Sequence, residues 1–96
     1  MLFANKIRQI REEKGFLQRH VSSAIDMDNA MFCKIERGDC LAKREHVIDI
    51  AKFLLIDENE LLILWLADKI IGLIENEVQI ANDALNIAKE DINKRK

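Results

Sequence analysis

The window NAMFCKIER, residues 29–37, holds side chains that can read base pairs. The amide of Asn29 can pair with N6 and N7 of adenine, and the ammonium of Lys34 can donate to O6 and N7 of guanine. Ala30 and Met31 offer apolar contact to the methyl group of thymine. In a helix, Lys34 lies one turn beyond Ala30 and Met31 on the same side. Two plainer interpretations stay open: Asn29 as a helix-capping residue, and Met31 as a partly buried one.

A second set of side chains suits the phosphates that flank such a site. Gln18, Arg19 and His20 begin an amphipathic stretch, where free backbone N–H groups of a first helical turn favour an anion. Three cations follow the 29–37 window, and phosphates or a narrow minor groove suit them; they are Arg37, Lys43 and Arg44. An ordinary solvated charge is the alternative interpretation for each of these residues.

Two short helices must position these groups. Apolar residues at Val21, Ile25, Phe32 and Ile35 have helical spacing on either side of a tight turn at residues 25–27. Asp26 suits that turn, because Asp is among the few residues other than Gly that adopt a left-handed conformation. Two helices joined in this way form a helix-turn-helix, whose second helix commonly enters the DNA major groove.

The segment from residue 7 to residue 62 resembles the XRE family, the Cro and lambda-type repressor helix-turn-helix domains. The matching runs are IRQIREEKG at 7–15, Gln18 at the start of the second helix, and KIERG at 34–38. The chain departs from the family at Leu17, where a capping Ser or Thr is usual, and at Asp26, where Gly is frequent.

The resemblance implies specific roles for several residues. It implies that Gln18 binds phosphate, and that base reading falls to Asn29, Ala30, Met31 and Lys34. It also implies a structural salt bridge between Arg11 in the first helix and Glu36 at the end of the third.

The whole chain is predicted to be all-α. We expect helices near residues 2–14, 18–25, 29–37, from 43 onward and 58–75, with Asp28 capping the third and Asp57 with Glu60 forming a capping box at the fifth. Residues 75–77 are predicted to separate a sixth helix, with Asn76 as its N-cap. The expected architecture is a five-helix lambda-repressor-like domain over residues 1–66 and a C-terminal helical extension over residues 67–96.

The extension carries an apolar stripe at heptad spacing, which is typical of helices that pack against one another. A terminal stripe of this length is either folded back in a monomer or shared with a second chain, and we expect a homodimer. The predicted dimerisation residues are Trp65, Ile70, Ile74, Val78, Ala81, Leu85, Ala88 and Ile92.

The charge of the chain is unevenly distributed, although its total is only −2. Residues 1–46 hold nine Lys and Arg against seven Asp and Glu, a net of +2, and residues 47–96 hold six against ten, a net of −4. The positive half is the one with the predicted helix-turn-helix, which favours local phosphate contact. The longest apolar run, residues 61–67, is too short for a membrane span, so a cytoplasmic protein is expected.

No residue pattern points to catalysis, a cofactor or a metal. Cys33 and Cys40 are seven positions apart, with His46 six further on, which matches no strong zinc motif. Two reduced thiols are the simple interpretation, and a redox switch at Cys33 is the alternative.

These observations together predict a sequence-specific DNA-binding transcriptional regulator and not an enzyme. It would act as an autoregulatory homodimer on an imperfect palindrome of double-stranded DNA, with residues 29–37 in the major groove. The alternative is an antitoxin or adaptor whose acidic C-terminal helices bind a different protein.

Overall fold

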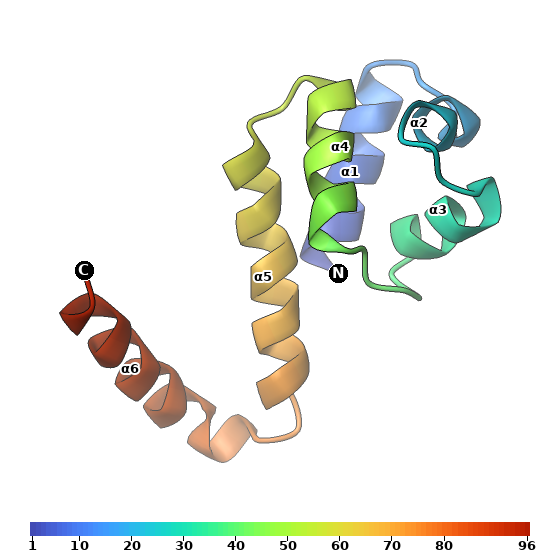
Figure 1. The fold of residues 1–96 in the computed structure, drawn as a ribbon. Coiled ribbons are helices and arrows are strands. Elements are labelled where there is room, and N and C mark those ends of the chain that lie inside the picture. The colour runs from blue at the N-terminus through green and yellow to red at the C-terminus, as the bar shows by residue number, and fades with distance from the viewer.

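The protein is all-helical, and its computed structural model describes residues 1–96. Six helices follow one another along the chain without a strand (Figure 1). They are α1 (Leu2–Glu13), α2 (Gln18–Ala24), α3 (Asn29–Glu36), α4 (Arg44–Leu54), α5 (Glu58–Ile74) and α6 (Val78–Lys94). Each helix end that the sequence predicted is confirmed to within one residue. None of the six has the length and apolar character needed to cross a bilayer.

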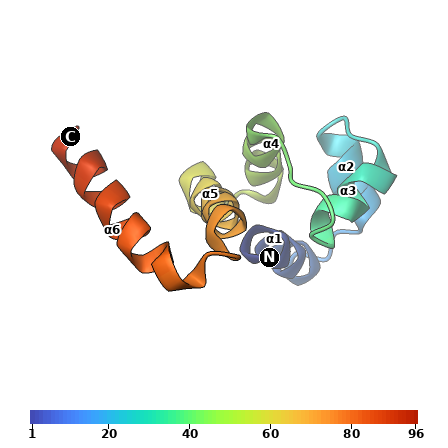
Figure 2. The ribbon, with the colours of Figure 1, turned by 90° about the horizontal axis from the view of Figure 1, so that it is seen from below.

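The five helices from α1 through α5 share one hydrophobic core. Its largest fully buried side chains include Ile7 of α1, Phe32 of α3, Ile50 of α4 and Leu61 of α5. Helix α4 packs against α5, and α5 also packs against α1, so α5 closes the side of the core away from α2 and α3 (Figure 2). Each helix contributes its apolar stripe, as the spacing of these residues requires.

The connections depend on four residues with positive φ. Gly15 and Gly38 end α1 and α3 at φ values of 76° and 83°, and Asp26 occupies the turn between α2 and α3 at φ 55°. The predicted left-handed turn at Asp26 is therefore confirmed. Leu55 ends α4 at φ 58°, which the sequence did not indicate, because a leucine rarely adopts this conformation.

The predicted capping side chains are not used. Asp28 and Asp57 stand at the N-cap positions of α3 and α5, but neither side chain accepts a hydrogen bond from its own helix. The predicted break before α6 is confirmed, although Glu77 and not Asn76 is the N-cap residue. The preferences of residues for helix ends predicted these boundaries correctly. The capping hydrogen bonds depend on side-chain rotamers, which the spacing of residues in the sequence does not determine.

Helix α6 extends away from the core, on the far side of α5 from α1 to α4 (Figures 1 and 2). None of its residues is buried, so it does not complete a monomeric core. Trp65, predicted to belong to the dimer surface, is instead a core residue that is only 8% exposed. Its indole N–H donates to the carbonyl of Ala42 at 2.7 Å, which explains why this polar ring faces inward.

Asp68 of α5 holds the start of α1. Its two carboxylate oxygens accept hydrogen bonds from the backbone N–H groups of Leu2 and Phe3, each at 3.0 Å. These N–H groups have no partner within α1 itself, and a carboxylate at a helix N-terminus also matches the helix dipole. Asp68 is 8% exposed, so these bonds tie α5 to α1 inside the protein.

We expect Asp68→Ala to lower the free energy of unfolding by about 2–3 kcal/mol, because it leaves two N–H groups without their charged acceptor. Asp68→Asn should cost less, since the amide oxygen still accepts one bond. Denaturant unfolding followed by circular dichroism measures both changes. Asp83→Ala, at an exposed position on α6, is the control and should change stability by less than about 0.5 kcal/mol; equal effects of Asp68→Ala and Asp83→Ala would contradict the assignment.

Candidate nucleic-acid interface

Helix α3 has one face in the core and one in solvent. Phe32, Ile35 and Glu36 are buried. The four candidate base-reading residues are all exposed, and they are Asn29, Ala30, Met31 and Lys34. The helix therefore presents its amide, apolar and ammonium groups outward from a fixed position.

A buried ion pair sets that position. Arg11 of α1 donates to Glu36 of α3 through Nε and Nη2, with both N···O distances at 2.8 Å. Its Nη1 also donates to the carbonyl of Phe16 at 2.8 Å. The Glu36 side chain is only 2% exposed, so the pair connects the end of α3 to α1 inside the protein. This bidentate geometry is available to Arg but not to Lys.

Arg11 does not lose its proton, and so does not break the ion pair, at ordinary pH. Its hydrogen bonds with Glu36 raise the pKa of Arg11 above its already high ordinary value, although burial partly opposes this. A raised pKa means that the stabilisation is complete below the unfolded-state value and is lost only as the pH rises through the folded-state value. Arg11 therefore stays charged until strongly alkaline pH.

Gln18 is bonded within the protein. Its Nε2 donates to Glu36 at 3.0 Å, and its Oε1 accepts from the Cys33 thiol at 3.0 Å. The amide thus joins the start of α2 to α3, and a phosphate contact from Gln18 would replace one of these bonds. Cys33 is half-buried and not in a disulfide, as is Cys40.

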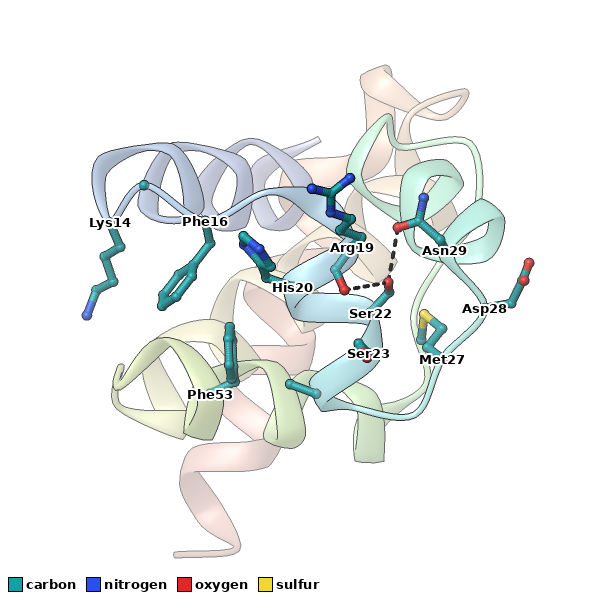
Figure 3. Close-up of a pocket in the computed structure, with 12 residues that line it drawn as sticks. Lys14, Phe16, Arg19, His20, Ser22, Ser23, Met27, Asp28, Asn29 and Phe53 are labelled. Carbon is teal, nitrogen blue, oxygen red and sulfur yellow. Dashed lines mark hydrogen bonds between the residues drawn. The ribbon is translucent and has the colours of Figure 1, made fainter.

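Asn29 is connected to α2 through Ser22. The Ser22 hydroxyl lies 3.0 Å from Asn29 Oδ1 and donates to it (Figure 3). The Asn29 side chain is exposed, so this bond orients the amide without burying it. Sequence reasoning missed this contact; the only signal was a small polar residue, Ser22, on the apolar side of its helix.

His20 acts within the protein at the start of α2. Its Nδ1 accepts a hydrogen bond from the backbone N–H of Leu17, the N-cap residue, at 2.9 Å. This is the bond that the N3 residue supplies in a capping box, and the bond that a Ser or Thr at position 17 would accept is not replaced by it. Its ring meets the edge of Phe16, which in turn contacts Phe53 of α4 with ring centroids 4.8 Å apart (Figure 3). A phosphate contact from His20, which the sequence predicts, would therefore compete with this structural role.

The remaining candidate cations differ in their surroundings. Arg19, Lys43 and Arg44 are exposed and carry no ion pair. Arg37 is also exposed, but its Nε is 3.1 Å from Asp39 Oδ2. No group of three His, Cys, Asp or Glu side chains gathers in a way that could hold a metal ion.

Comparisons with protein-family models, with curated proteins and with solved structures find no match to this chain.

We expect Arg11→Ala to destabilise the protein by about 3–5 kcal/mol, because it leaves the Glu36 carboxylate buried without its partner. Thermal or urea unfolding measures this loss. Arg37→Ala is the matched control: it removes an arginine from an exposed pair and should cost less than about 1 kcal/mol. If the two variants were equally stable, the buried pair would not hold α3 in place.

Proposed function

We propose that the chain is a sequence-specific DNA-binding transcriptional regulator. In this proposal α2, the turn at Asp26 and α3 form a helix-turn-helix of the XRE type, and α3 enters the major groove. Asn29 and Lys34 read base edges, while Ala30 and Met31 contact thymine methyl groups. The chain represses or activates its own gene as a homodimer, without a cofactor or catalytic activity.

The observation that carries this proposal is the division of α3 into two faces. Its buried face is fixed by Phe32, Ile35 and the Arg11–Glu36 ion pair, and its outer face carries Asn29, Ala30, Met31 and Lys34, which suit base edges, beside the half-buried Cys33. A reading helix needs this arrangement, because its side chains must meet the bases from a rigid support. The bond from Ser22 to Asn29 adds a further constraint on the amide.

The phosphate contacts in this proposal are best assigned to Arg19, Lys43 and Arg44. These three are exposed and unpaired, whereas Gln18, His20 and Arg37 already have partners within the protein. Phosphate contacts position a protein on the duplex and make its affinity fall with salt.

A second function has one observation in its favour. Helix α6 has no buried residue, so its apolar side is free for another molecule. An antitoxin or adaptor would use it to bind a different protein, with DNA binding secondary. The mass of the purified chain in solution separates the two cases, because a missing protein partner predicts a monomer or an aggregate.

The proposal is tested by fluorescence anisotropy on DNA from upstream of the protein's own gene, with a scrambled duplex as reference. We expect Asn29→Ala to weaken binding to the native duplex by about 1–3 kcal/mol, the value of one bidentate base contact, and to leave binding to scrambled DNA unchanged. Arg19→Ala should weaken both and reduce the slope of log K against log[salt] by about 1.

Two control variants make the result specific. Ser22→Ala removes the hydrogen bond to Asn29 but keeps its amide, so it should weaken native binding less than Asn29→Ala does. Lys89→Ala removes an exposed cation from α6 and should change neither affinity. Equal binding of the wild type to native and scrambled DNA would refute sequence-specific reading at this operator.

A further inference from the structure

Five polar side chains form a continuous chain of hydrogen bonds from the core to the outer face of α3. Gln18 donates through Nε2 to Glu36 at 3.0 Å and accepts at Oε1 from the Cys33 thiol at 3.0 Å. Asn29 Nδ2 donates to Cys33 Sγ at 3.8 Å, and Asn29 Oδ1 accepts from the Ser22 hydroxyl at 3.0 Å (Figure 3). The chain therefore links the buried end of α3 to its exposed amide.

The direction of these bonds follows from the charge of Glu36. Its carboxylate is ionised in the pair with Arg11 and can only accept hydrogen bonds. The Gln18 amide must therefore turn Nε2 toward Glu36, which leaves Oε1 for Cys33. An amide oxygen also only accepts, so the thiol uses its one proton on Gln18. Its sulfur is then left to accept from Asn29.

The same reasoning fixes the orientation of the Asn29 amide. Its Nδ2 faces Cys33, so its Oδ1 faces Ser22 of α2. An amide oxygen has two lone pairs and an amide nitrogen has two protons, and the chain uses one of each. Asn29 is exposed, so the remaining lone pair and the remaining proton are available to a base edge.

Cys33 decides this orientation, whereas Ser22 alone would not. The Ser22 hydroxyl has a second acceptor within reach, the carbonyl of Arg19 at 3.3 Å (Figure 3). A hydroxyl both donates and accepts, so Ser22 could pair with either end of the amide. The proton of Cys33 is already used by Gln18, and its sulfur suits only the Nδ2 end.

We propose that Cys33 is a positioning residue, which holds the Asn29 amide in one of two orientations related by a half turn and thereby makes it select adenine over guanine. The inference rests on the proposed function for the presence of a base opposite Asn29. The hydrogen-bond chain itself is argued from the contacts between α1, α2 and α3 alone.

The selection follows from the edges of the two purines in the major groove. Both present N7 as an acceptor, but adenine carries the N6 amino donor where guanine carries the O6 acceptor. When Nδ2 of the held amide donates to N7, Oδ1 lies opposite the neighbouring group. There Oδ1 accepts from N6 of adenine, whereas it meets O6 of guanine as one acceptor against another. An amide that is free to turn would present Nδ2 to O6 and tolerate guanine.

Fluorescence anisotropy with a pair of duplexes tests this selection. One is the DNA from upstream of the protein's own gene, and the other carries guanine in place of the adenine whose preference Asn29→Ala removes. We expect Cys33→Ala to lower the ratio of adenine to guanine affinity about three- to tenfold, the value of one hydrogen bond, mainly through tighter binding of guanine. A general loss of structure would instead weaken binding to both duplexes.

Two variants make this result specific. Cys33→Ser should keep the wild-type ratio, because a hydroxyl also donates one proton and accepts in return. Cys40→Ala is the matched control: Cys40 is the other half-buried free thiol, and its Sγ contacts Met31 Sδ at 3.7 Å and no member of the chain. It should also leave the ratio unchanged. A Cys33→Ala variant with the wild-type ratio would overturn the inference.

Nuclear magnetic resonance of the DNA-free protein separates this inference from the proposed function. Cross-relaxation from the Nδ2 protons of Asn29 should reach the β-protons of Cys33 in the wild type, and in Cys33→Ala it should shift in part to those of Ser22. Wild-type cross-relaxation of equal strength to both residues would overturn the held orientation. A held amide in a protein that binds all duplexes equally would reject base reading by Asn29, and the proposed function with it, while the hydrogen-bond chain stands.

Discussion

The buried pair of Arg11 and Glu36 is the interaction on which the rest of the arrangement depends. A carboxylate that is 2% exposed is stable only with its partner in place, so the end of α3 must stay against α1. Gln18 shares the same carboxylate, which brings the start of α2 into the same network. Three short segments that could not pack alone thereby hold one fixed geometry, and the outer face of α3 follows from it.

Helix α5 connects this network to the C-terminal part of the chain. Its inner side closes the core through Leu61 and Trp65, and Asp68 holds the first N–H groups of α1. Its outer side carries the exposed apolar residues Ile63, Leu66, Ile70 and Leu73. One helix thus fixes α1, which in turn anchors α3 through Arg11.

The sequence predicted the helices and the turns well, because local chemistry determines them. Gly15, Asp26 and Gly38 mark three turns, and heptad spacing marks α6 as an apolar helix without a place in the core. The Arg11–Glu36 pair came from resemblance, since no local pattern relates residues 25 positions apart. The roles of Asp68, Trp65 and Ser22 were missed because each depends on a contact between distant helices. Asp68 left one readable signal, a lone carboxylate on the inward side of an apolar helix.

Selection of bound duplexes from a random DNA pool shows whether α3 reads base pairs. We expect an enriched motif with two-fold symmetry, whose half-sites lie about 10–11 base pairs apart. In a parallel selection, Lys34→Ala should lose the preference at one position in each half and keep it at the others. Two results would contradict base reading by α3. One is enrichment of no motif, and the other is enrichment of the same motif by the wild type and by a variant that lacks both the ammonium group of Lys34 and the amide of Asn29.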